Sequence, residues 1–374
     1  MQILRQTNLE ALEKARTLGS DGVISLLESK KLVGRGGASS NTARKWKECR
    51  DTPADERFVV CNANEGEPGS FKDKLILKYN AETVIEGMLV AAYTIGAKRC
   101  FIYLRGEYDY LSPHLQKQID DVLSTAKLDG VSMEIVHGAG AYICDEATAL
   151  IKSIMGFRGS PMYRPPHPNT QGLWGKPTLV GNVETFTCAA QAILFDDWDP
   201  NLRLFSLSGN IKNARVYEFP LGVKMSSVID VARPQKKLKA MSFGCFGGIM
   251  PVDENMRITP ESVCKGNCKH GTYGIIFIDE TNNVVDISYS IAKFYAYESC
   301  GKCTPCREGT IRMLNLLKKI RSGKGERSDL QLLRELATHV QDTSLCMLGQ
   351  MCGNHILTTL EHFPGDYEHY LKKK

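Results

Sequence analysis

Three cysteines near the C-terminal end, Cys300, Cys303 and Cys306, follow one another at C-x2-C-x2-C spacing. Glycines and a proline around them favour a loop, which would place three thiolates around one point, as a cubane iron–sulfur cluster requires. Cys346 is the best candidate for the fourth ligand, because the segment between it and the loop has a helical pattern and can fold back. The spacing therefore predicts one [4Fe–4S] cluster on these four cysteines.

Two other chemistries use the same residue type. Zinc sites usually pair two C-x2-C units or add histidines, and disulfides belong mainly to secreted chains. One distant fourth cysteine fits a cluster better than zinc, and nothing marks this chain as secreted. Zinc and a purely structural role for the cysteines stay as the alternatives.

Length and composition limit the function classes. The chain has 374 residues, enough for two or three domains. Its 47 basic and 42 acidic residues give a net charge of +5, too mild to predict nucleic-acid or membrane-surface binding. The first ten residues lack the apolar core of a signal peptide, and no apolar run is long enough to cross a membrane. We therefore expect a cytoplasmic protein whose 13 cysteines stay reduced and available for metal.

A glycine-rich stretch at residues 32–40 offers the first contacts for a small ligand. It contains Gly34, Arg35 and Gly36 and follows a helical pattern over residues 8–31. Glycines let backbone N–H groups approach an anion closely, so a phosphate-bearing cofactor is a sensible ligand. The stretch is neither a Walker A loop nor a dinucleotide fingerprint, and a plain loop is the alternative.

A second set of polar groups follows a buried strand pattern at residues 58–61. Asn62, Asn64 and Glu65 stand in the loop at its C-terminal end, where ligands of open α/β sheets gather. Their amides and carboxylate suit the hydroxyl chain and ring edge of a flavin. A surface turn rich in Asn, Gly and Pro would have the same composition.

The elements around these loops alternate. Helix and strand patterns follow one another at residues 81–96, 99–104, 112–126 and 132–136. This alternation predicts βαβ units and a largely parallel sheet. Polar loops at residues 138–146 and 180–185 open further helices, and several such loops in one α/β domain favour a buried nucleotide-like ligand. From residue 204 short strands indicate a β-grasp insert, which is followed by the helical domain that carries the cysteines.

Five motifs occur in the order of a known family. They lie at residues 34–38, 60–73, 138–144, 182–185 and 298–309. Together they closely resemble the NADH-oxidising flavoprotein subunit of respiratory complex I and its homologues in NAD-linked or electron-bifurcating hydrogenases and formate dehydrogenases. The resemblance implies an α/β fold in which residues 1–30 form N-terminal helices and residues 31–200 a Rossmann-like FMN-binding domain. Residues 201–285 would form a β-grasp (SLBB) insert and residues 286–374 a helical bundle with the [4Fe–4S] cluster.

The resemblance also implies a flavin site. By position, FMN would lie against Gly34, Arg35, Gly36, Lys45, Asn62, Asn64, Glu65, Tyr142, Glu146, Asn182 and Thr185. Electrons would enter as a hydride from NAD(P)H onto the flavin and leave singly through the cluster. Such a protein works as an NAD(P)H dehydrogenase of the diaphorase type beside a thioredoxin-like [2Fe–2S] subunit and a larger iron–sulfur or catalytic subunit.

The departures from the family pattern fall in the expected nucleotide pocket. Three aromatic positions of the family are Ser40, Glu48 and His167 here, although stacking on an aromatic ring contributes about 1–3 kcal/mol per base. The family sequence Gly-Glu-Glu is Asp145, Glu146 and Ala147 here, and the lost glutamate is one that disfavours NADPH. Two hypotheses follow. In the first, the nucleotide specificity is relaxed and the pocket also accepts NADP(H). In the second, the pocket is degenerate and no longer binds a nucleotide, so that the subunit only relays electrons or has a structural role.

Cys264 and Cys268 lie outside the usual pattern of the family. With Cys245, Cys352 or His355 they would offer ligands for a further metal. Two thiols at C-x3-C without a clear partner pair are weak evidence, and ordinary cysteines are the favoured alternative.

Overall fold

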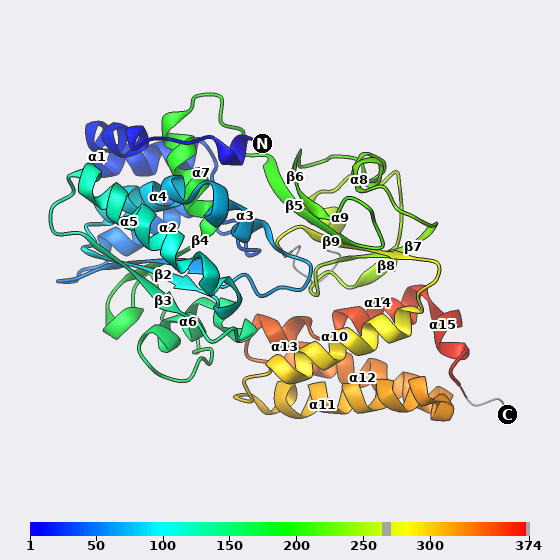
Figure 1. Ribbon diagram of the computed structural model, residues 1–374. Helices are drawn as coiled ribbons and strands as arrows, with labels where there is room; N and C mark the ends of the chain where they lie inside the picture. The colour runs from blue at the N-terminus through cyan, green and yellow to red at the C-terminus, as the bar shows by residue number, and fades with distance from the viewer. Residues whose placement is uncertain (264–270, 372–374) are drawn as a thin grey trace. The chain divides into compact units, whose positions relative to one another are not determined.

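The computed structural model describes residues 1–263 and 271–371 and divides the chain into two compact units (Figure 1). The first unit comprises Met1–Gly66 and Phe71–Leu202, and the second comprises Glu67–Ser70 and Arg203–Lys374. Cys264 and Cys268 lie outside the described residues.

The first unit is built on a four-stranded sheet. Its strands are β1 (Phe58–Ala63), β2 (Arg99–Leu104), β3 (Ser132–His137) and β4 (Thr178–Asn182), in the order β3-β2-β1-β4. All three pairings are parallel, as the sequence predicted, and Phe58 lies opposite Arg99 and Thr178. Every residue of β1 is buried, which is typical of a central strand in a parallel sheet.

Helices connect and cover these strands. They are α1 (Glu10–Ser29), α2 (Thr42–Asp51), α3 (Lys72–Tyr79), α4 (Ala81–Ile95), α5 (Ser112–Ala126), α6 (Ala147–Ile154) and α7 (Val183–Leu194), with short 3-10 turns at Gln2–Leu4, Gly106–Leu111, Tyr142–Asp145 and Leu173–Gly175. The central helices α4 and α7 pack against each other and against β1, and α1 lies on both. The carboxyl ends of the parallel strands therefore carry the loops of interest at one edge of the sheet.

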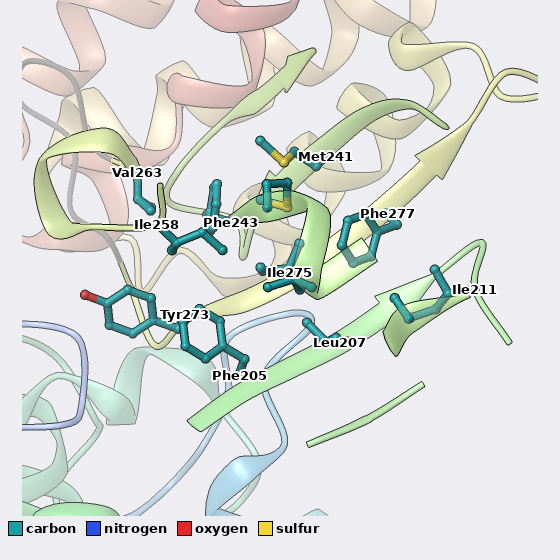
Figure 2. Packing of buried hydrophobic residues seen from close by; sticks show 13 residues of the cluster. Phe205, Leu207, Ile211, Met241, Phe243, Ile258, Val263, Tyr273, Ile275 and Phe277 are labelled. Atoms are coloured by element: carbon teal, nitrogen blue, oxygen red, sulfur yellow. The ribbon is translucent and has the colours of Figure 1, made fainter. Parts of the chain in front are cut away.

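The second unit contains a mixed sheet of five strands. They are β5 (Leu202–Gly209), β6 (Arg215–Pro220), β7 (Leu238–Phe243), β8 (Ile249–Pro251) and β9 (Gly274–Asp279), in the order β6-β5-β9-β7-β8. Two short helices, α8 (Met225–Ala232) and α9 (Pro260–Val263), accompany them. Figure 2 shows Phe205, Phe243 and Phe277 in the core of this sheet, which α8 completes with Met225 and Val228.

The C-terminal part of the second unit is helical. It consists of α10 (Val284–Glu298), α11 (Thr304–Lys319), a π-turn (Ile320–Lys324), α12 (Arg327–Thr343), α13 (Met347–Met351), α14 (Asn354–His362) and α15 (Pro364–Glu368). Contacts run from α10 to α11, α11 to α12, α12 to α14 and α14 back to α10, so these four helices close into a bundle. The helical connection expected between Cys306 and Cys346 is thus confirmed.

Candidate functional site

The first glycine-rich loop is a closed turn. A bridge between Val33 and Asn41 closes its base, and the N–H of Gly34 donates to the carbonyl of Ser40 at 2.8 Å. Asn41 then caps α2 by accepting from the N–H of Arg44. The N–H of Arg35 donates to Oγ1 of Thr185 at 2.9 Å, which ties the loop to the start of α7.

The side chain of Arg35 points to protein carbonyls. Its guanidinium donates to the carbonyls of Leu202 at 3.1 Å and Pro200 at 3.2 Å and lies 6.0 Å from the ring centre of Trp198. The side chain is buried. Arg35 therefore anchors the loop with its side chain. Because the N–H groups of Gly34 and Arg35 are paired within the fold, the loop can offer a ligand only the backbone N–H groups from Gly36 onward.

Two glycines allow loops to meet closely. A Cβ on Gly36 would lie 3.1 Å from Cβ of Asn182, and a Cβ on Gly66 would lie 2.6 Å from Cδ2 of the buried Tyr142. Any larger residue at Gly66 would displace the tyrosine ring. The loops after β1, β3 and β4 thus come together with the first glycine-rich loop, as a ligand cradle requires.

The two asparagines after β1 hold the connection after β3. Nδ2 of Asn62 donates to Oδ1 of Asp145 at 2.7 Å, and Nδ2 of Asn64 donates to the carbonyl of Ala141 at 3.1 Å. Among the described residues, Oδ1 of Asn64 is buried without a hydrogen-bond donor. A buried acceptor of this kind fits the ring N–H of a flavin.

Two glutamates of the candidate set cap helices. Glu65 accepts from the N–H groups of Lys72 and Asp73 at 2.8 and 3.0 Å, at the start of α3, and from the hydroxyl of Tyr108 at 3.0 Å. Glu146 is the N-cap of α6 and forms an ion pair with Arg164. Both carboxylates are therefore held in fixed orientations.

Lys45 lies among other charges. Its Nζ donates to the carbonyl of Val180, in the middle of β4. Burial of the ammonium group, and then the charge of Arg164, lower the pKa of Lys45 to about 8. A nearby anion such as a phosphate would relieve both effects, because it stabilises the charged form.

A buried charge network stands behind Asn182, and the sequence analysis missed it. Nζ of Lys72 lies 2.6 Å from Asp73, 3.0 Å from Glu184 and 3.2 Å from Oδ1 of Asn182, and all three charged side chains are buried. Burial alone would lower the pKa of Lys72, but the carboxylates of Asp73, Glu184 and Glu65 outweigh it and raise the pKa. The adjacent charges of Lys72 and Asp73, at the end of the motif at residues 60–73, were the available signal.

The positions expected to stack on a nucleotide are polar in the structure. Ser40 and His167 are exposed, and Glu48 accepts a hydrogen bond from Nδ2 of Asn169 at 2.9 Å. Ala147 is the first residue of α6. The Glu48–Asn169 bond places α2 beside the segment that carries His167.

Three of the four cysteines lie at helix starts, and Cys300 lies in the loop between α10 and α11. Cys303 is the N-cap of α11, Cys306 lies in its first turn, and Cys346 is the N-cap of α13. The pKa of Cys306 is raised to about 12, mainly by burial and also by the nearby thiols of Cys303, Cys346 and Cys300, while the hydrogen bond with Ser299 lowers it. Oγ of Ser299 lies 3.2 Å from Sγ of Cys306. Four thiols with a hydroxyl beside one of them fit the ligation of a [4Fe–4S] cluster.

Two of the residues considered as partners of Cys264 and Cys268 in a further metal site have hydrogen-bond partners within the fold. Cys352 is buried and donates to the carbonyl of Gly349 at 3.1 Å, and Nδ1 of His355 is 2.8 Å from Oγ of Ser288. Over residues 1–263 and 271–371, no three His, Cys, Asp or Glu side chains form a site for a single metal ion. This holds for the four cysteines too, because in a [4Fe–4S] cluster each thiolate would bind a different iron. Within the same residues, no helix has the length and apolar character needed to span a membrane.

Loops of the flavin-binding kind at the ends of parallel strands, together with a four-thiol centre in a helical bundle, define the class: an oxidoreductase subunit with flavin and iron–sulfur centres. Family comparison agrees, because residues 27–191 match the Nuo51 FMN-binding domain and residues 286–370 match the NADH-ubiquinone oxidoreductase-F iron-sulfur binding region. The chain belongs to this family of flavoprotein subunits, as the sequence motifs predicted.

Relatives with known functions span the chain. A subunit of the NADH-quinone oxidoreductase of Aquifex aeolicus is 37% identical over 100% of this chain and 91% of its own length. The HndC subunit of an NADP-reducing hydrogenase of Solidesulfovibrio fructosivorans is 36% identical over 98% of this chain and 79% of its own. The crystal structure of an NAD+-reducing [NiFe]-hydrogenase in the H2-reduced state has a similar fold, with a TM-score of 0.89 and 36% identity. That alignment covers 98% of this chain and 65% of the hydrogenase chain, which is therefore the longer of the two.

Proposed function

We propose that this chain is the NAD(P)H-oxidising flavoprotein subunit of a multi-subunit redox complex. The observation that carries the proposal is the joint presence, in a member of this family, of a loop cradle with a buried unpaired acceptor at Asn64 and a four-thiol centre. When bound, FMN accepts a hydride and releases electrons one at a time, and a [4Fe–4S] cluster carries single electrons.

The chain's own residues would divide the work of binding the flavin. The N–H groups of Gly34 and Arg35 are used within the fold, so the backbone N–H of Gly36 and the ammonium of Lys45 are the donors that suit the phosphate. The amides of Asn62 and Asn64 suit the ring edge and hydroxyls. The full proposed set is Gly34, Arg35, Gly36, Lys45, Asn62, Asn64, Glu65, Tyr142, Glu146, Asn182 and Thr185. Cys300, Cys303, Cys306 and Cys346 would hold the cluster.

The proposal leaves two possibilities for the nucleotide site, either a site that accepts NADP(H) or no nucleotide site at all. Arg164 lies close enough to Lys45 to lower its pKa and pairs with Glu146, and its guanidinium, three residues before His167, suits a nucleotide with an additional phosphate. The name of the HndC relative, which belongs to an NADP-reducing hydrogenase, also favours NADP(H). The alternative is a subunit without a nucleotide site that relays electrons between partner subunits.

Restoring the missing groups tests for a nucleotide site. We expect the double variant Ser40→Phe and Ala147→Glu to bind NADH roughly tenfold more tightly in calorimetry, because a ring adds stacking. Ser40 is exposed and Ala147 begins α6, where a carboxylate is favoured by the helix dipole, so both changes fit the fold.

The matched control is Ser124→Phe, which adds the same ring at an exposed serine of α5 and should leave NADH affinity unchanged. No gain in the double variant would count against a weakened site and favour the electron relay.

The proposal also includes partner subunits and a fold for residues 201–285. The relatives are named as subunits of larger enzymes, so we expect this chain to work beside a thioredoxin-like [2Fe–2S] subunit and a larger iron–sulfur or catalytic subunit in the cytoplasm. The five-stranded sheet with α8 supports a β-grasp (SLBB) insert at residues 201–285, between the flavin domain at 31–200 and the cluster domain at 286–374.

A further inference from the structure

Ser299 stands directly beside one of the proposed cluster ligands. Its Oγ is 3.2 Å from Sγ of Cys306, and its backbone is fixed at the end of α10, where its N–H donates to the carbonyl of Tyr295. The N–H of Gly301 also reaches Oγ of Ser299, at 3.4 Å. The hydroxyl therefore has neighbours on two sides.

These neighbours determine the direction of the hydrogen bond. The hydroxyl oxygen accepts from the N–H of Gly301, and a serine has one O–H to donate. A thiolate bound to iron carries no proton, so the hydroxyl must be the donor to Cys306. Arg307 donates to the carbonyl of Gly301 at 2.9 Å and so holds the peptide that follows Gly301, next to the one whose N–H contacts the hydroxyl.

A second serine, Ser344, lies near the same proposed cluster ligand, Cys306. Oγ of Ser344 is buried, and no hydrogen-bond partner for it occurs in the part of the chain that the structure describes. A Cβ built on Gly349 would lie 2.4 Å from this Oγ and 3.2 Å from Cβ of Cys306, so Ser344 sits next to the thiol cluster. A buried O–H without an acceptor fits a site where the sulfurs of a cluster supply one.

We propose that Ser299 is a positioning residue that raises the reduction potential of the cluster by donating a hydrogen bond to Sγ of Cys306, with Ser344 as a second O–H donor. Reduction adds one electron and hence one negative charge to the cluster. Hydrogen bonds to the sulfurs stabilise this more negative form, since donors bind charged acceptors more strongly. The inference rests on the proposed ligation by the four cysteines.

Two variants of Ser299 whose new side chains have nearly the same shape test the proposal. Ser299→Thr keeps the hydroxyl, and Ser299→Val replaces it by a methyl group. We expect an EPR-monitored redox titration of the iron-loaded protein to give a wild-type midpoint for Ser299→Thr. For Ser299→Val we expect the equilibrium between reduced and oxidised cluster to shift about tenfold toward the oxidised form. For a one-electron couple this lowers the midpoint potential by about 59 mV. Ser344→Ala should lower the midpoint in the same direction, and Ser322→Ala, at an exposed serine of the π-turn, should not.

Iron content separates this inference from the ligand assignment. Full iron with equal midpoints in Ser299→Thr and Ser299→Val would overturn the role of the hydroxyl. Loss of iron from Ser299→Val but not from Ser299→Thr would support the hydroxyl contact with the cluster. Unmodified protein that binds no iron under anaerobic reconstitution would instead count against ligation by the four cysteines.

Discussion

Replacing Cys346 with alanine is expected to destroy the [4Fe–4S] cluster. Iron should fall from about four atoms per chain to three or fewer, and the EPR signal of the reduced four-iron cluster should disappear, because one iron would lose its thiolate. Iron analysis and EPR after anaerobic reconstitution measure both effects.

Cys352 supplies the matched control. It is buried, lies six positions beyond Cys346 and donates to the carbonyl of Gly349, so it belongs to the same segment without being a proposed ligand. Cys352→Ala should keep its iron and its EPR signal. The reverse result, with the cluster kept in Cys346→Ala and lost in Cys352→Ala, would move the fourth ligand to Cys352.

Replacing Lys72 with methionine is expected to cost about 3–5 kcal/mol in the free energy of unfolding, because removing one partner leaves buried charges without compensation. Asp73 and Glu184 would face each other in the interior without the ammonium that now lies 2.6 and 3.0 Å from them. Urea unfolding followed by circular dichroism gives the change in free energy.

Lys74 provides the comparison within the same helix. Its side chain is exposed, so Lys74→Met should change the free energy of unfolding by less than about 0.5 kcal/mol. Equal stability of the two variants would show that the Lys72 network contributes little to the fold and would remove its proposed support of Asn182 at the flavin loops.

The sequence predicted the elements well because their signals are local. Alternating helix and strand patterns gave the parallel sheet, with β2 at Arg99–Leu104 and α5 at Ser112–Ala126 where they were expected. The helical pattern after Cys306 gave α11 and α12. Cysteine spacing predicted the thiol centre because three of the proposed ligands stand within seven residues.

Side-chain directions at the candidate site could not be predicted, because the partners lie far along the chain. The guanidinium of Arg35 reaches carbonyls at Pro200 and Leu202, and Lys72 meets Glu184. The carboxylates of Glu65 and Glu146 were predicted as flavin contacts, the second from the family resemblance alone, and in the structure both accept hydrogen bonds at the starts of helices. Residue type alone does not separate a cap from a ligand.

The most direct test of the central claim is an anaerobic titration of the protein loaded with FMN and iron, first with NADH and then with NADPH, following the visible absorbance of the flavin. We predict that one of the two bleaches the flavin and that the cluster is then reduced, as expected if the chain has the proposed nucleotide site beside both centres. Full FMN and iron content with no bleaching by either nucleotide would contradict nucleotide oxidation and show that electrons enter from a protein partner.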